Sequence, residues 1–281
     1  MSEHMTVDGL PVPVRPGETM LTACRRAGIS IPTLCYHPGL EPYGACRLCV
    51  VEATRPDTHA GPPAPGRVVA SCTTPAQAGT VVRTDSPRVM RVRRAVLTFL
   101  LERCPDAGIV QQLAEGLGIA PAPGSRARIP APTESALPPV PAPLKEKCIL
   151  CGRCVQACER LGHFAIGFAG RGVFRRVTPP FGTSSETCAA CGACMEVCPT
   201  GAVDVVIERS ALPPHAGVPV ARAHLPAWQT TVPLGTCRSC GHTLWSNRMI
   251  QARGGPVPEG MADLCPACRR KEMLSRFCRS G

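Results

Sequence analysis

CILCGRCVQAC (residues 148–158) and CAACGACMEVCP (residues 188–199) are the two stretches that decide the fold of this chain. Both carry cysteines at the spacing C-x2-C-x2-C-x3-C, which holds pairs of [4Fe–4S] clusters in bacterial proteins. Three thiolates on one tight loop can occupy three corners of a cubane, whereas a local fourth would strain the loop. We therefore expect each cluster to take its fourth ligand from the other stretch. The predicted sets are Cys148, Cys151, Cys154 and Cys198 for one cluster, and Cys158, Cys188, Cys191 and Cys194 for the other.

The length and cysteine content limit the class of protein. The 281 residues suffice for two or three small domains, and the 19 cysteines fall mostly into C-x2-C pairs, as metal sites do. Zinc sites or disulfides are the alternatives, and two copies of a four-cysteine iron–sulfur spacing disfavour both. The N-terminal MSEHMTVDGL lacks the basic and then apolar pattern of a secretory signal, and no apolar run approaches the length of a membrane span. We therefore expect a reducing, cytoplasmic setting and no direct membrane insertion.

The formal charge of +11 invites a nucleic-acid hypothesis, but it counts every cysteine as neutral. Three iron–sulfur clusters and one zinc, each bound by four thiolates and worth about −2, would together contribute about −8 and leave roughly +3. The basic residues are therefore interpreted mainly as compensation for metal–thiolate charge, and no nucleic-acid partner is expected.

The first 87 residues predict a small mixed sheet packed on a helix. Asp8-Gly9 between apolar runs is typical of a hairpin, residues 18–27 predict a helix that Gly28 ends, and strands are expected at VVEA after Cys49, at 68–72 and at 80–84. A [2Fe–2S] cluster fits the C-x10-C-x2-C spacing with one distant cysteine, and an enlarged hairpin tip at 56–66 accounts for that distance. Its predicted ligands are Cys35, Cys46, Cys49 and Cys72, whereas Cys24 is expected in the core.

Three segments connect or extend these sites. Residues 88–103 predict a helix with an apolar stripe of Val92, Ala95, Val96, Phe99 and Leu100. Residues 120–144 and 209–233, rich in Pro, are predicted linkers. Between the two four-cysteine runs, alternation at 163–168 and 173–177 predicts a hairpin, His163 is expected not to be a ligand, and 203–207 is expected to be a closing strand.

The C-terminal region holds a different cysteine pattern. Two C-x2-C pairs lie 24 residues apart, as in a zinc ribbon or a rubredoxin-like module, and predict a site made of Cys237, Cys240, Cys265 and Cys268. Four thiolates suit zinc or a single iron; zinc is preferred, and a further iron–sulfur cluster is a third possibility. The basic tail from Arg269 is expected to be helical, with Cys278 a free thiol.

Three stretches of the sequence resemble a known family. CYHPGLEPYGACRLCVVE, SCTTPAQAGTVVRTDS and CILCGRCVQAC, within about residues 5–208, resemble the N-terminal iron–sulfur region of the large peripheral-arm subunit of respiratory complex I. They are equally similar to the diaphorase-side subunit of NAD-linked hydrogenases and to the N-terminal region of NAD-dependent formate dehydrogenases. The resemblance implies a β-grasp [2Fe–2S] domain and a two-cluster ferredoxin domain that relay electrons between a flavin- and NAD-binding subunit and a catalytic metalloenzyme subunit.

One departure from that family concerns its middle segment, which carries H-x3-C-x2-C-x5-C after a helix. Here the corresponding ERCPDAGIVQQLAEGLG contains only Cys104 and no histidine. Because one cysteine cannot hold a cubane, we predict that this cluster is absent and that the segment is plain helix.

The sequence therefore predicts an α+β chain of six parts. They are a [2Fe–2S] β-grasp domain (1–87), a helical segment (88–119), a linker (120–144), a ferredoxin domain with two [4Fe–4S] clusters (145–208), a linker (209–233) and a zinc-ribbon-like module with a basic tail (234–281). No glycine fingerprint for a dinucleotide is present, so we expect an electron-relay subunit without its own substrate site. The alternatives are a free multi-cluster ferredoxin carrier and an iron–sulfur sensor or zinc-ribbon regulator.

Overall fold

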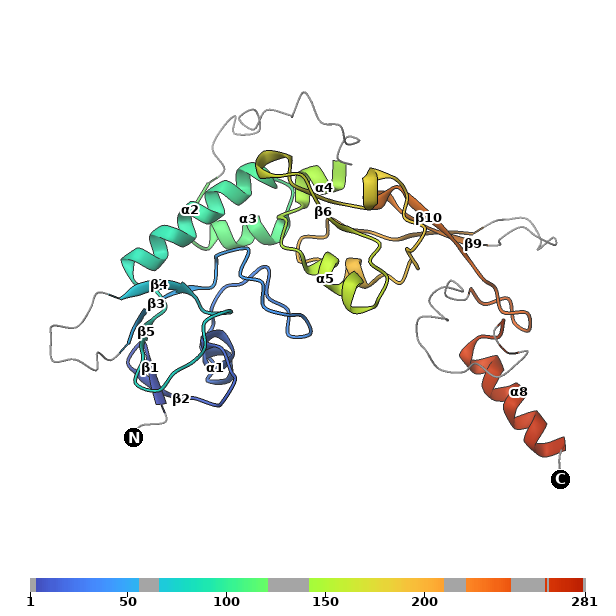
Figure 1. Ribbon diagram of the computed structural model, residues 1–281, viewed down its shortest axis with the longest axis horizontal. Coiled ribbons are helices and arrows are strands. Elements are labelled where there is room, and N and C mark those ends of the chain that lie inside the picture. Colours follow the sequence, from blue (N-terminus) through green and yellow to red (C-terminus); the bar gives the residue numbers. More distant parts are fainter. Residues whose placement is uncertain are drawn as a thin grey trace. The chain divides into compact units, whose positions relative to one another are not determined.

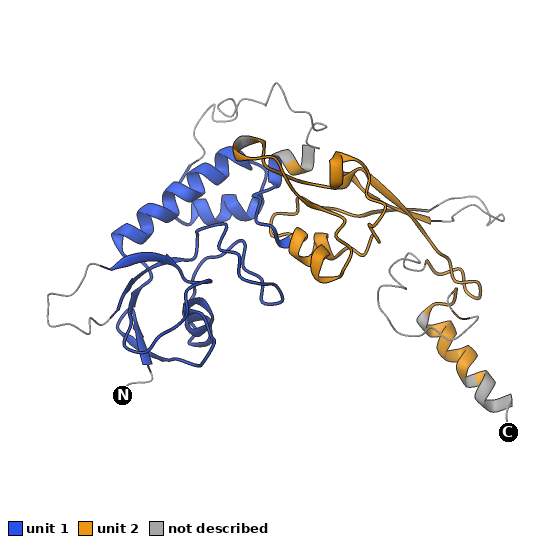
Figure 2. Ribbon diagram, viewed as in Figure 1, with its two compact units in different colours: residues 1–131, 145–153 blue, residues 132–144, 154–281 orange. Residues whose placement is uncertain are grey.

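The computed structural model describes residues 4–55, 66–120, 142–209, 221–243, 261 and 263–279, and it divides into two compact units (Figure 2). Unit 1 comprises residues 1–131 and 145–153, and unit 2 comprises residues 132–144 and 154–281. Nearly all of the predicted hairpin tip at 56–66 and most of the predicted linker at 120–144 lie outside the described residues. Among the helices that are described, none combines the length and the apolar character that a bilayer crossing requires.

Unit 1 is built on a five-stranded sheet in the order β2-β1-β5-β3-β4, in which only β1 and β5 are parallel (Figure 1). The Asp8-Gly9 turn has positive φ at both residues, 49° and 85°, as a two-residue hairpin between right-twisted strands requires. The strands are β1 (His4–Val7), β2 (Leu10–Pro13), β3 (Val50–Thr54), β4 (Arg67–Ala70) and β5 (Val81–Arg83).

Helix α1 (Met20–Arg26) packs on this sheet, as in a β-grasp (Figure 1). It begins at Thr19, whose side chain accepts a hydrogen bond from the Thr22 backbone in a capping box. Its apolar face joins the strands in one core, in which Cys24 is fully buried as expected.

Helix α2 (Pro87–Arg103) follows an N-cap at Ser86, but its buried face differs from the predicted stripe. Phe99 is 67% exposed, and Ala95 is exposed as well, so this part of the prediction was wrong. The buried positions are Val89, Arg93, Leu97 and Leu101. The hydrophobic pattern did not predict this face, because one of its residues is Arg93, whose guanidinium makes hydrogen bonds inside the protein.

Two shorter helices follow α2. Helix α3 (Gly108–Glu115) packs on α2 in a second core. Helix α4 (Ala142–Lys147) begins within the last residues of the predicted linker.

Unit 2 contains the short elements around the cysteine runs. The insert between the runs forms the antiparallel pair β6–β7, whose strands begin four and three residues later than the predicted ranges. These elements are α5 (Arg153–Arg160), whose first residue belongs to unit 1, β6 (Gly167–Ala169), the 3-10 turns η2 (Gly172–Phe174) and η3 (Pro180–Gly182), β7 (Arg176–Thr178) and α6 (Ala193–Glu196).

A three-stranded antiparallel sheet includes most of the described residues of the region predicted to be a linker at 209–233. Its order is β10-β9-β8, with β8 (Val206–Arg209), β9 (Ala221–Leu225) and β10 (Thr230–Leu234). Buried and exposed residues alternate along β9 and β10, which is the period of a strand. The high proline content led to the linker prediction, although these prolines lie where a hairpin tolerates them. Pro226 begins the turn η4 (Pro226–Trp228), and Pro233 occupies an exposed position of β10.

The C-terminal helix α8 (Pro266–Arg279) contains the expected basic tail. The side chain of Cys278, predicted to be a free thiol, lies outside the described side chains.

Candidate iron–sulfur and metal sites

The four cysteines predicted to bind a [2Fe–2S] cluster lie on loops at one end of the unit 1 sheet. Cys35 follows α1, Cys46 and Cys49 precede β3, and Cys72 follows β4. Three of them are nearly inaccessible, with Cys35 at 4%, Cys49 at 1% and Cys72 at 1% exposure.

Their sulfur atoms interact with one another. The thiols of Cys46 and then Cys72 lower the pKa of Cys35, while Cys72 lowers the pKa of Cys49 to about 6. The same contacts raise the pKa of Cys46 and Cys72. The backbone N–H of Cys46 also donates to the Cys35 sulfur at 3.4 Å. Four converging sulfurs with a backbone donor, shielded from water, fit an iron–sulfur cluster.

Two arginines of unit 1 hold the backbone on both sides of two of these cysteines. Arg93 of α2, only 7% exposed, donates from Nε to the Leu48 carbonyl (3.1 Å) and from Nη2 to the Val50 carbonyl (2.9 Å), on either side of Cys49.

Arg153 does the same for Cys35. Its Nη1 donates to the Leu34 carbonyl (3.3 Å) and its Nη2 to the Tyr36 carbonyl (3.0 Å). A planar guanidinium suits such paired contacts, because its donors have a fixed fork geometry. Neither arginine was identified from the sequence as part of the site. For Arg93 the only indication was its position among the apolar residues of one helix face, and for Arg153 there was no indication in the sequence.

The two four-cysteine runs share an unusual backbone conformation. Leu150 and Ala190, each just before the second cysteine of its run, have φ of 54° and 50°. Gly152 and Gly192, each just after that cysteine, have φ of 78° and 77°. Left-handed backbone costs roughly 1–3 kcal/mol at a non-glycine residue, and alternation of this kind turns successive N–H groups inward around an anionic group. The repeated pattern fits loops that enclose a cluster.

Cys158, Cys188, Cys191 and Cys194 all belong to unit 2, where their thiols lie near one another. Burial raises the pKa of Cys194 to about 12, and the proximity of Cys191, Cys188 and Cys158 adds to this effect. The backbone N–H of Ala165 donates to the Cys158 sulfur at 3.2 Å. His163 is half-buried and donates its backbone N–H to the Cys158 carbonyl.

Of the other predicted set, Cys148 and Cys151 belong to unit 1, whereas Cys154 and Cys198 belong to unit 2. Cys154 lies in the first turn of α5, and the Cys198 sulfur accepts a hydrogen bond from the Ala202 backbone N–H at 3.3 Å.

Cys104, the lone cysteine of the middle segment, is fully buried between α2 and α3. Its thiol donates to the Cys148 carbonyl at 3.0 Å, and burial raises its pKa to about 12. The hydrogen bond to the backbone and the apolar surroundings of this thiol fit a structural role.

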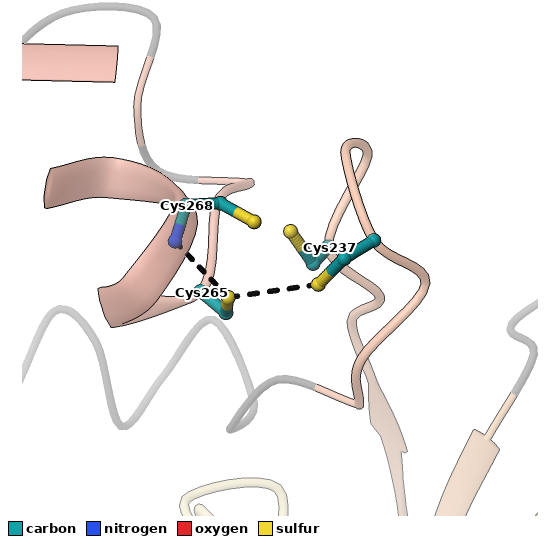
Figure 3. Close-up of side chains that lie close together, drawn as sticks. Cys237, Cys265 and Cys268 are labelled. Carbon is teal, nitrogen blue, oxygen red and sulfur yellow. Dashed lines mark hydrogen bonds between the residues drawn. The ribbon is translucent and has the colours of Figure 1, made fainter. Parts of the chain in front are cut away.

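The C-terminal cysteines form the most compact sulfur group among the described residues. The sulfurs of Cys237, Cys240, Cys265 and Cys268 all lie within 4.8 Å of one another, and Cys240 and Cys265 are 3.7 Å apart. In Figure 3 the labelled side chains Cys237, Cys265 and Cys268 point toward a common centre. A tetrahedral Zn–S distance of about 2.3 Å implies sulfurs about 3.8 Å apart, so the geometry fits zinc.

Backbone N–H donors stabilise the thiolate form of one cysteine in this site. Backbone N–H groups, that of Cys265 foremost, lower the pKa of Cys237 to about 6. Gly241, with φ of 69°, donates to the Cys237 carbonyl and closes the first C-x2-C turn. The thiolate is the form that binds metals, so both features favour metal binding.

Two protein-family models match the chain. Residues 4–87 match a "2Fe-2S iron-sulfur cluster binding domain", and residues 143–205 match a "4Fe-4S dicluster domain". The chain therefore contains a [2Fe–2S] ferredoxin domain and a [4Fe–4S] dicluster domain.

The chain is similar to part of much longer NADH oxidoreductase proteins. The chain is 36% identical over 211 residues to an NADH-quinone oxidoreductase subunit of Rhizobium meliloti, and the match covers 71% of this chain and 23% of that protein. It is also 36% identical over 214 residues to "NADH dehydrogenase [ubiquinone] iron-sulfur protein 1, mitochondrial" of Solanum tuberosum, covering 70% and 27%. The chain thus spans about a quarter of the length of these relatives.

Among solved structures, a chain of "NAD+-reducing [NiFe]-hydrogenase in the H2-reduced state" is similar with a TM-score of 0.56 and 33% identity. The match covers 72% of this chain and 86% of that one.

Proposed function

Because the chain belongs to the iron–sulfur protein family that includes this hydrogenase chain and matches part of the NADH oxidoreductase relatives, we propose that it is an electron-relay subunit of an NAD-linked oxidoreductase. It would pass electrons between a flavin- and NAD(H)-binding subunit and a catalytic hydrogenase, formate dehydrogenase or other reductase subunit. It would have no substrate site of its own.

The observation that carries this proposal is the pair of hydrogen bonds made by Arg153. The residue directly precedes Cys154 of the first [4Fe–4S] run, and its guanidinium is bonded to both carbonyls that flank Cys35 of the [2Fe–2S] loop. A short path of covalent and hydrogen bonds would therefore connect the loops that carry proposed ligands of two different clusters. Such a path suits a protein that conducts electrons between its centres.

The proposed cofactors are one [2Fe–2S] cluster, two [4Fe–4S] clusters and one zinc. Their ligands would be the four sets of cysteines described above, and each cluster, when bound, would supply a one-electron redox centre. The protein's own part is to exclude water with buried loops and to donate N–H groups to the sulfurs, as at Cys35, Cys158 and Cys198. Iron in place of zinc is the alternative occupant of the C-terminal site.

The middle cluster of the family is proposed to be absent. Cys104 makes a hydrogen bond to the Cys148 backbone and shares its buried environment with apolar residues of α2 and α3. The packing of this segment is that of an ordinary hydrophobic core, which supports the proposal.

The six-part organisation given above remains our proposal, with one change: the part at 209–233 is the strand-containing segment described in unit 2. We also propose a cytoplasmic location, without a nucleic-acid partner and without direct insertion into a membrane.

Anaerobic purification of the native protein, followed by mass spectrometry and metal analysis, tests the proposed function. We expect about ten iron atoms and one zinc per chain, with a flavoprotein and a metalloenzyme subunit copurifying. A chain that runs alone with its clusters intact would support a free ferredoxin carrier instead. Salt-dependent DNA binding would support the regulator hypothesis, and a chain without iron would contradict every redox hypothesis.

A further inference from the structure

The hairpin formed by β9 and β10 belongs to unit 2 but lies outside both matched domains, which cover residues 4–87 and 143–205. The short turn η4 (Pro226–Trp228) begins the connection between its strands, and Gln229 completes it with φ of 47°. A left-handed residue restricts the backbone conformation of the turn, and one bulky side chain lies just before it.

That side chain is Trp228, which is only 3% exposed. Its indole N–H makes no fully formed hydrogen bond within the described part of the chain, although a buried Trp N–H usually finds a partner. The same N–H lies near the Cys194 sulfur, and Cys194 is itself buried. A buried donor without a partner among the described residues therefore lies beside a proposed cluster ligand.

A second contact fixes the hairpin to the same cysteine run. The hydroxyl of Thr230, 2% exposed, accepts a hydrogen bond from the Ser185 backbone N–H at 3.2 Å, three residues before Cys188. The same hydroxyl donates to the Trp228 carbonyl at 2.9 Å. Thr230 thus connects the backbone of Trp228 to the start of the loop that carries Cys188, Cys191 and Cys194.

We propose that Trp228 donates its indole N–H to the Cys194 sulfur when a [4Fe–4S] cluster is bound, and that the β9–β10 hairpin thereby raises the reduction potential of that cluster. This inference rests on the proposed function, because it assumes a cluster held by Cys158, Cys188, Cys191 and Cys194. Reduction adds negative charge that is shared with the ligand sulfurs, so an N–H donor stabilises the reduced state more than the oxidised state. The buried indole also keeps water away from this sulfur.

The first test compares Trp228→Phe with wild type and with Trp245→Phe, a change at the chain's other tryptophan. Phe keeps an aromatic ring but has no N–H donor. In a redox titration followed by electron paramagnetic resonance, we expect one [4Fe–4S] signal of Trp228→Phe to titrate at a lower potential. At a fixed applied potential the reduced-to-oxidised ratio of that cluster should fall about fivefold, while the other two clusters and Trp245→Phe stay unchanged. Unchanged potentials in Trp228→Phe would overturn the inference.

A second measurement uses wild-type protein and so does not depend on the folding of a variant. With tryptophan labelled by 15N in the indole ring, pulsed electron–nuclear double resonance of the reduced protein should show a 15N coupling to one [4Fe–4S] cluster. The coupling should persist in Trp245→Phe. Two [4Fe–4S] signals without any 15N coupling would overturn the role of Trp228 alone, whereas the absence of [4Fe–4S] signals would overturn the proposed function as well.

Discussion

Replacing Arg93 by Met should destabilise unit 1 at its [2Fe–2S] site. The change removes two hydrogen bonds from a charged donor, at 3.1 Å and 2.9 Å, and leaves the carbonyls on both sides of Cys49 without those donors in a buried setting. Each such bond contributes about 1.5–3 kcal/mol, and the loss is offset in part because the buried guanidinium no longer has to be desolvated. That burial already lowers the pKa of Arg93. We expect a net loss of roughly 2–4 kcal/mol in the free energy of unfolding.

The assay is anaerobic urea unfolding followed by the visible circular dichroism of the [2Fe–2S] cluster, which reports on unit 1. With a dependence of about 2 kcal/mol per M urea, the midpoint should fall by about 1–2 M. Arg93→Lys should lie between wild type and Arg93→Met, because an ammonium group cannot match the fork that spans both carbonyls.

The matched control is Arg94→Met, a change at the exposed neighbour on the same helix. Its midpoint should stay close to that of wild type. Equal midpoints for Arg93→Met and Arg94→Met would refute the argument that Arg93 holds the Cys49 loop.

Three further changes test the metal sites. Cys191→Ser should remove one [4Fe–4S] signal from the paramagnetic resonance spectrum and interrupt electron transfer from NADH through the native complex; an unaltered spectrum would exclude Cys191 as a ligand. Cys104→Ser should leave the iron content unchanged, because a serine hydroxyl can make the same donation to the Cys148 carbonyl; a lower iron content would show that the middle segment does bind a cluster. Cys240→Ser should lower the zinc content measured by plasma mass spectrometry without changing the iron content, whereas a loss of iron instead would identify iron as the occupant of this site.

Cysteine spacing was the part of the sequence from which most could be predicted. Thiolates must lie at set separations to share a metal, so the runs at 148 and 188 predicted a dicluster domain, and the family match to residues 143–205 confirms that this domain is present. The Asp8-Gly9 turn could also be predicted from the sequence, because its positive φ values favour these residue types.

What sequence could not show was how polar side chains are used inside the protein. Arg93 lies in the buried face of α2 because two carbonyls more than forty residues away accept its donors, and no local pattern encodes that. The strands β9 and β10 were missed because their prolines fall in a turn and at an exposed strand position, where proline is tolerated. The side-chain contacts of Trp228 and Arg153 are with residues distant in sequence, so a local pattern could not predict their roles.

The parallel pairing of β1 with β5 also bears on how the protein is made. Thr6 pairs with Val81, so the chain between these two strands contains all four cysteines proposed for the [2Fe–2S] cluster. Pairing across so long a segment is slow, because the chain entropy is lost before the contact forms. On the ribosome, the sheet cannot be completed until residue 83 has left the exit tunnel. Nascent chains that end before β5 should therefore fail to retain a cluster, and insertion should begin only after the first 83 residues are free to fold.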